Sequence, residues 1–111
     1  IMAIPELSPR AFIDRWPQKE VGQKVILLDV REAAELELAS LPTANHIPMN
    51  QVPQRLDELD VNKPIVVMCH SGVRSCRVAE FLVTRGFKKV FNLSGGIDAW
   101  SKQLDPKVPQ Y

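Results

Sequence analysis

A cysteine that follows a predicted buried strand is the most reactive side chain that the sequence offers. Residues 65–68 are apolar and mostly β-branched, which predicts a buried strand, and Cys69 comes directly after them. A short loop with one glycine, Gly72, separates this cysteine from a helical pattern. The thiol therefore faces a helix amino terminus, where free N–H groups and a partial positive charge favour an anion. We expect a nucleophilic thiolate at Cys69, with a pKa lowered from about 8.5 towards neutrality.

The residues after Cys69 favour an anion-binding loop over a structural buried cysteine. Gly72 frees the backbone to curl, so that successive N–H groups point inwards, and the loop is too short to hide its polar groups. Arg74 closes the loop with a positive charge, and Arg77 is a weaker candidate for the same task. The candidate site is therefore one nucleophile and six residues that surround the bound anion. They are Cys69, His70, Ser71, Gly72, Val73, Arg74 and Ser75.

Three other polar or reactive side chains are interpreted as structural. Asp29 lies inside an apolar run, and a buried carboxylate needs a partner, which Arg31 or an arginine of the loop could supply. His46 is interpreted as a hydrogen-bonded structural residue rather than a base. Cys76 is interpreted as a small packing residue rather than a resolving thiol. The two cysteines lack C-x-x-C spacing, so the sequence indicates neither a zinc site nor a redox pair, and no metal is expected.

Length and charge limit the classes of function. A chain of 111 residues that is 45% hydrophobic suits one domain, over residues 1–111, with a single core. The net charge of +1 and the lack of like-charge blocks give no reason to expect a nucleic acid or an acidic membrane surface as partner. The sequence has no apolar run near 18 residues and no signal-peptide pattern, so we expect a soluble, intracellular protein of the cytoplasm.

Strand-like and helix-like segments alternate along the chain, which predicts an open α/β layer structure. The continuous apolar run at residues 25–30 is typical of a parallel sheet that is covered on both faces. In such sheets, sites form beyond the carboxyl ends of the strands, where Cys69 is placed. Strands are expected at residues 25–30, 65–68 and 89–93, with a short one near residues 43–48. Helices are expected from Ser8-Pro9 onwards, over 32–39, along Val52, Leu56 and Leu59, over 75–85 and over 94–100, before an extended tail at 105–111.

Four motifs carry a resemblance to a known family. In chain order they are Asp29-Val-Arg-Glu32, His46-Ile-Pro48, Cys69-His-Ser-Gly-Val-Arg-Ser75 and Leu93-Ser-Gly-Gly-Ile-Asp-Ala-Trp100. Their order and spacing resemble the rhodanese-like (thiosulfate sulfurtransferase) domain over nearly the whole chain. The chain is similar to small single-domain rhodaneses and to the carboxyl-terminal rhodanese domain of molybdopterin-synthase adenylyltransferase/sulfurtransferase proteins, which end in a similar tail. The resemblance implies a parallel sheet of about five strands with helices on both faces.

The resemblance also implies sulfur transfer by double displacement, without a cofactor. Cys69 would take the sulfane sulfur from a small anionic donor such as thiosulfate and pass it, as a persulfide, to cyanide, a thiol or a protein. A protein could also be the sulfur donor. Arg74 would bind the sulfonate oxygens of the donor, and His70 would line the loop and help to set selectivity. The hydroxyls of Ser71 and Ser75 would bond to the persulfide, although Ser75 is expected chiefly as the helix cap.

Two other functions stay open at this stage. Cysteine phosphatases and arsenate reductases of the same fold have five residues between cysteine and arginine, whereas four separate Cys69 from Arg74 and the next position is Ser75. The loop is therefore too tight for a tetrahedral phosphate. Non-catalytic rhodanese-like interaction modules usually lack the cysteine, which is present here.

Overall fold

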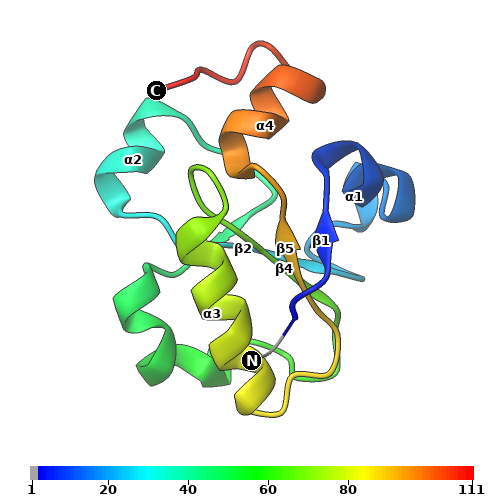
Figure 1. The fold of residues 1–111 in the computed structure, drawn as a ribbon, viewed down its shortest axis with the longest axis vertical. Helices are drawn as coiled ribbons and strands as arrows, with labels where there is room; N and C mark the ends of the chain where they lie inside the picture. Colours follow the sequence, from blue (N-terminus) through cyan, green and yellow to red (C-terminus); the bar gives the residue numbers. More distant parts are fainter. Residues whose placement is uncertain (1–2) are drawn as a thin grey trace.

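The computed structural model describes residues 3–111, so residues 1 and 2 of the expected domain lie outside the described part. Five parallel strands form one sheet in the order β1-β5-β4-β2-β3, which confirms the α/β fold class (Figure 1). The strands are β1 (Glu6–Leu7), β2 (Ile26–Asp29), β3 (Asn45–His46), β4 (Ile65–Met68) and β5 (Val90–Leu93). The helices are α1 (Pro9–Arg15), η1 (Gln18–Glu20), α2 (Ala33–Leu38), η2 (Met49–Glu58), α3 (Val73–Thr84) and α4 (Gly96–Gln103).

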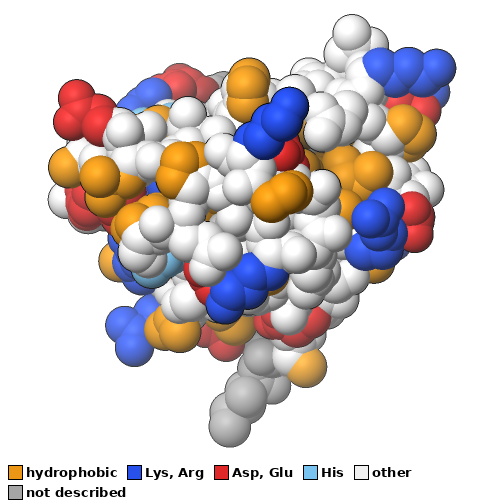
Figure 2. Space-filling view, turned by 90° about the horizontal axis from the view of Figure 1, so that it is seen from above, with side chains coloured by type: hydrophobic (Ala, Val, Ile, Leu, Met, Phe, Trp, Pro, Cys, Tyr) orange, Lys and Arg blue, Asp and Glu red, His pale blue; other side chains and the backbone are white. Residues whose placement is uncertain are grey.

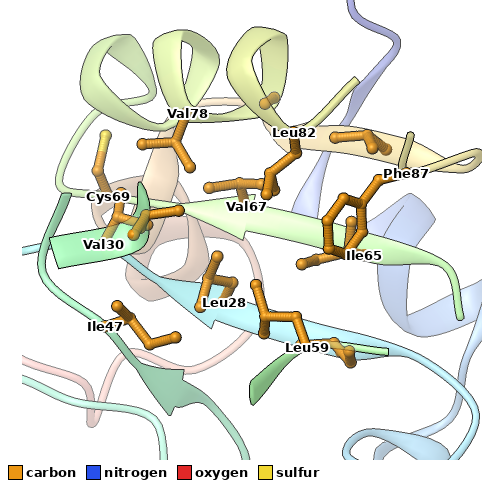
Figure 3. Packing of buried hydrophobic residues seen from close by; sticks show 14 residues of the cluster. Leu28, Val30, Ile47, Leu59, Ile65, Val67, Cys69, Val78, Leu82 and Phe87 are labelled. Atoms are coloured by element: carbon orange, nitrogen blue, oxygen red, sulfur yellow. The ribbon is translucent and has the colours of Figure 1, made fainter. Parts of the chain in front are cut away.

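The central strand β4 is apolar throughout because each of its faces lies in a separate core. Successive strand residues point to opposite faces of a sheet. In β4, Ile65 and Val67 pack under α3 and η2, whereas Val66 and Met68 pack under α1 and α4. Figure 3 shows the first of these cores, with α3 above the sheet. The two faces together hold β4, and therefore the residue that follows it, in a fixed position.

Three elements differ from the expected ones, and one of them, the three-residue 3-10 helix η1, was not predicted at all. The sequence analysis did not predict β1, which is only two residues long and pairs with the end of β5. The segment with the apolar positions Val52 and Leu56 is not an α-helix but a 3-10 helix, η2, which is kinked at Arg55. Pro53 explains this difference, because it lacks an N–H group and its ring clashes with the carbonyl of the preceding α-helical turn.

The expected partner of Asp29 is Arg31. Its Nη2 atom lies 2.7 Å from Oδ2 of Asp29 and its Nε atom 3.0 Å from Oδ1, and both residues are buried. Nε2 of His46 lies 2.6 Å from the carbonyl oxygen of Arg31, in agreement with the structural interpretation of this histidine. This buried cluster joins the carboxyl ends of β2 and β3 beside the cysteine loop.

The surface carries no dominant charge of one sign in the view of Figure 2, which looks down on the end of the molecule with the C-terminal tail. Basic and acidic side chains are interspersed there. Within residues 3–111, none of the helices combines the length and apolar character needed to cross a bilayer.

Replacing Arg31 by methionine should lower the free energy of unfolding by about 3 kcal/mol or more, because it leaves the carboxylate of Asp29 buried without its partner. Urea unfolding at neutral pH measures the change. Arg55→Met is the matched control, because the ion pair of Arg55 with Glu58 is exposed and its loss should hardly move the unfolding midpoint. Equal midpoint shifts in the two variants would contradict the assignment.

Candidate active site

The cysteine loop lies against the first turn of α4, and this contact sets the direction of its peptide groups. The N–H of Ile97 donates to the carbonyl of Cys69 at 2.9 Å, and the N–H of Asp98 donates to the carbonyl of His70 at 3.2 Å. Gly96 makes this approach possible, since a methyl group on it would overlap both carbonyls, and its φ of 61° favours glycine. Gly96, the second glycine of the last sequence motif, therefore serves the shape of the loop.

The sulfur of Cys69 accepts three hydrogen bonds from the loop and from α3. The N–H of Gly72 lies 3.1 Å from Sγ, the N–H of Ser75 3.4 Å and the hydroxyl of Ser75 3.3 Å. Cys69 is buried, at 1% exposure, and stands at the end of β4 beneath the start of α3 (Figure 3). A buried sulfur that accepts hydrogen bonds from N–H and hydroxyl groups is suited to carry negative charge.

Burial raises the pKa of the Cys69 thiol, but hydrogen bonds outweigh burial. These bonds come from the Ser75 hydroxyl and from the N–H groups of Ser75, Gly72 and Ser71, and the net result is a lowered pKa. The geometry therefore agrees with the thiolate expected from the sequence. Because the thiolate is the nucleophilic form, the site favours covalent chemistry at sulfur.

The expectation that Ser75 caps the helix is wrong. The helix α3 begins at Val73, and its N-cap is Gly72, whose φ of 107° is in the left-handed region. This early start places Ser75 inside the first turn, where its buried hydroxyl lies 3.3 Å from the cysteine sulfur and 2.5 Å from Oδ1 of Asn92. A hydroxyl has one proton, so it donates to only one of these two acceptors at a time.

Asn92 is a site residue that the sequence analysis missed. It is buried in β5, and its Nδ2 group donates to the carbonyl of Gly72 at 3.0 Å and to the carboxylate of Glu6 at 3.0 and 3.2 Å. These acceptors fix the amide, so that its oxygen faces the hydroxyl of Ser75. The signal in the sequence was a single asparagine among apolar strand residues, since a buried amide requires partners.

The guanidinium of Arg74 is bound to a carboxylate. Its Nη1 and Nη2 atoms lie 2.7 and 2.9 Å from the carboxylate oxygens of Glu35, which the sequence analysis also missed. The ring of His70 stacks on the ring of Tyr111, with centroids 4.0 Å apart and planes 10° from parallel. Val73 points outwards and is 63% exposed. The six expected binding residues therefore surround Cys69 in different ways, and those whose hydrogen bonds reach the sulfur are Gly72 and Ser75.

Cys76 lies near the start of α3 and belongs to neither core, which differs from the packing role expected from the sequence. It is half-buried, and burial raises the pKa of its thiol. It lines a surface hollow of about 490 Å³ together with Arg77, Glu6 and Asn92. The structure thus separates Arg77 from Arg74, which lies on the side of α2. Among residues 3–111, no group of three His, Cys, Asp or Glu side chains could hold a metal.

Comparisons with known proteins agree with this geometry. The sequence pattern of the rhodanese-like domain family matches residues 15–103. The chain is 38% identical to "Putative sulfurtransferase YtwF" of Bacillus subtilis over 106 residues, 96% of this chain and 99% of that protein. It is 36% identical to the thiosulfate sulfurtransferase GlpE of Actinobacillus pleuropneumoniae, over 96% of this chain and 94% of that protein. A crystal structure of a rhodanese-like domain protein from Staphylococcus aureus superimposes with a TM-score of 0.79 at 26% identity, covering 97% and 99% of the two chains.

Replacing Ser75 by alanine should raise the pKa of Cys69 by about one unit, because the thiolate loses a hydrogen bond that the thiol needs less. The pH dependence of the alkylation rate of Cys69 measures this pKa, with Cys76 replaced by serine in every sample. Ser40→Ala removes an exposed hydroxyl remote from the loop and serves as the control. An unchanged alkylation midpoint in Ser75→Ala would show that its hydroxyl does not stabilise the thiolate.

The hydrogen bonds from Arg74 lower the pKa of Glu35 from 4.5 to about 2. Because the pKa in the folded state is the lower one, the ionised carboxylate stabilises the fold above pH 4.5, and this contribution is lost as the pH falls from 4.5 to 2. Thermal unfolding between pH 6 and pH 2 should therefore show a shallower loss of Tm in Glu35→Gln than in the wild type. Parallel curves for the two proteins would refute the linkage.

Proposed function

Since the chain belongs to the rhodanese-like domain family, we propose that it is a sulfurtransferase that carries sulfur as a persulfide on Cys69. The observation that supports this proposal most directly is the sulfur of Cys69 with three hydrogen bonds, from Gly72 N–H and from the N–H and hydroxyl of Ser75. Such donors favour a thiolate before the reaction and a persulfide anion after it.

In the first half of the reaction, the thiolate attacks the outer sulfur of thiosulfate or of another sulfane donor. A bond forms between this sulfur and Sγ of Cys69 while the bond within the donor breaks. The bonding electron pair leaves with the departing group, which is sulfite when the donor is thiosulfate. The thiolate and the donor together carry three negative charges, as do the persulfide and sulfite, so the step needs neither a proton nor an oxidant.

In the second half, a nucleophilic acceptor attacks the terminal sulfur of the persulfide. Cyanide becomes thiocyanate, and an acceptor thiolate becomes a new persulfide. Cys69 leaves as a thiolate, which is stabilised by the same N–H and hydroxyl groups as before. Fixed donors aimed at developing charge are worth roughly 3 kcal/mol each in comparable oxyanion sites. The loop therefore stabilises the leaving group of this step as well as the nucleophile of the first.

The residues around the sulfur take different parts in the proposed reaction. Arg74 is assigned to the sulfonate oxygens of a bound donor, which requires exchange with the carboxylate of Glu35. His70 forms the wall of the loop, and Ser71 contributes its N–H group. Val73 exposes an apolar side chain at the rim, where a protein donor or acceptor would touch the chain. Thiols are kept reduced in the cytosol, and the cytoplasm is the compartment that we propose for this protein.

Two observations disfavour the alternative functions. The position at which phosphatases have their arginine is occupied by Ser75, and its hydroxyl bonds to the sulfur instead of leaving room for a phosphate. A non-catalytic interaction module would have no use for a cysteine with a lowered pKa at the centre of a hydrogen-bonded loop. Turnover of an aryl phosphate at a rate comparable with thiosulfate would favour the first alternative.

Brief exposure to thiosulfate should add one sulfur atom, about 32 Da, to the intact protein, because Cys69 accepts the sulfane sulfur. Mass spectrometry measures the adduct, which dithiothreitol should remove. Cys76→Ser should form the same adduct, whereas Cys69→Ser should form none.

A second sample, with a cysteine desulfurase and cysteine in place of thiosulfate, tests a protein donor. Failure of both donors to load a reduced Cys69 that reacts with thiol reagents would reject the proposed function. A sulfur adduct that persists in Cys69→Ser would also reject it.

A further inference from the structure

Arg74, which the proposed function assigns to the sulfur donor, is already bound to the carboxylate of Glu35. This ion pair affects which sulfur donors can bind at the site. The two nitrogens of the Arg74 guanidinium lie 2.7 and 2.9 Å from the two carboxylate oxygens. This is the bidentate geometry in which arginine binds carboxylates most firmly. An anionic donor that uses Arg74 must therefore compete with a carboxylate for the same guanidinium.

Further hydrogen bonds hold the carboxylate of Glu35 in this place. The phenol of Tyr111 donates to it at 2.8 Å, and the N–H of Glu32 donates to it at 2.9 Å, as part of the capping box of α2. Tyr111 is fixed in turn, because its oxygen accepts from Nη1 of Arg31 at 3.0 Å and its ring stacks on His70. Glu35 thus cannot turn away from Arg74 without breaking several contacts.

Arg31, which contacts Glu35 and Tyr111 on the same side of the loop as Arg74, is also committed, whereas Arg77 lines the separate hollow beside Cys76. Arg31 is bound to Asp29 by both Nε and Nη2 and is fully buried. Each of these two guanidinium groups therefore has a bound carboxylate, and the two pairs together are neutral. The thiolate of Cys69 then adds a negative charge. A sulfur donor with two negative charges therefore meets no net positive charge from the Arg74–Glu35 pair or the Arg31–Asp29 pair.

We propose that Glu35 is a specificity-determining residue that disfavours dianionic sulfur donors such as thiosulfate relative to donors with a single negative charge. This inference rests on the proposed function and names its donor class, which consists of thiosulfonates (R–SO2–S⁻) and organic persulfides (R–S–S⁻). For a thiosulfonate, the Cys69 thiolate attacks the outer sulfur, the S–S bond breaks, and the sulfinate R–SO2⁻ leaves with the electron pair. One thiolate and one monoanion give one persulfide and one monoanion, so charge and atoms balance.

The kinetic test compares thiosulfate with methanethiosulfonate anion, which presents the same outer sulfur with one charge fewer. The rate of persulfide formation on Cys69 is measured against donor concentration for the wild type and for Glu35→Gln. Glu35→Gln should lower the half-saturating concentration of thiosulfate by about tenfold and that of the monoanion by about threefold, because the lost repulsion scales with donor charge. Glu37→Gln, which removes an exposed carboxylate of the same helix, should change neither value.

A second variant guards against a folding defect in the first. Tyr111→Phe keeps the ring that stacks on His70 but removes the hydroxyl that donates to Glu35. It should shift the half-saturating concentration of thiosulfate in the same direction as Glu35→Gln, by a smaller factor. Thermal unfolding of each variant shows whether it is folded under the assay conditions.

A binding measurement separates this inference from the proposed function. Calorimetric titration with thiosulfate of Cys69→Ser, alone and combined with Glu35→Gln, reports affinity without any sulfur transfer. The combined variant should bind thiosulfate more tightly. An unchanged or weaker affinity, or equal kinetic shifts for the two donors, would overturn the role of Glu35. If thiosulfate, methanethiosulfonate and the cysteine desulfurase with cysteine all fail to load wild-type Cys69, the proposed function fails, whatever the calorimetry shows.

Discussion

The site depends on two planar peptide groups, those that follow Cys69 and His70, whose orientation is fixed by hydrogen bonds from α4. The carbonyls of Cys69 and His70 accept hydrogen bonds from Ile97 and Asp98. In a trans peptide, the N–H of the next residue points away from the carbonyl. The bond at the carbonyl of His70 therefore turns the N–H of Ser71 towards the opposite side, the side of the sulfur, and this N–H is one of the groups that lower the pKa of the Cys69 thiol. The close approach permitted by Gly96 thus becomes an electrostatic property of the cysteine.

A chain of polar groups behind the sulfur extends this control to the surface. The sulfur contacts the hydroxyl of Ser75, this hydroxyl contacts the amide of Asn92, and the amide contacts Glu6. Because Asn92 is fixed by its acceptors, the hydroxyl proton of Ser75 is the part of this series that can turn between two acceptors. The proton bonds to Asn92 or to the sulfur, and an ionised sulfur attracts it more strongly. The network can therefore follow the charge on Cys69 without movement of the backbone.

Local sequence patterns predicted the main parts of the fold and the place of the candidate nucleophile. The apolar runs predicted the central strands, and the loop after β4 made Cys69 the candidate reactive group. A positively charged partner for Asp29 was also expected, because a buried carboxylate needs one, and Arg31 is one of the two candidates that the sequence offered. Because Gly72 adopts the left-handed conformation, α3 begins two residues earlier than expected. Ser75 is therefore not the helix cap but a hydrogen-bond donor to the sulfur. A local pattern could not reveal this, since a serine near a helix start usually caps it.

Contacts between distant positions were beyond prediction from a single sequence. Glu35 meets Arg74 across 39 positions, and Tyr111 meets Arg31 across 80. Such contacts follow from tertiary packing rather than from residue spacing. The same is true of Glu6, which reaches Asn92 only because the two-residue strand β1 docks on the sheet edge beside β5. Short edge elements open locally at low free energy. Local opening of β1 would therefore separate Glu6 from Asn92 while the core stays folded. The opening of this sheet edge would thus affect the hydrogen bonds that link Asn92, Ser75 and the sulfur of Cys69.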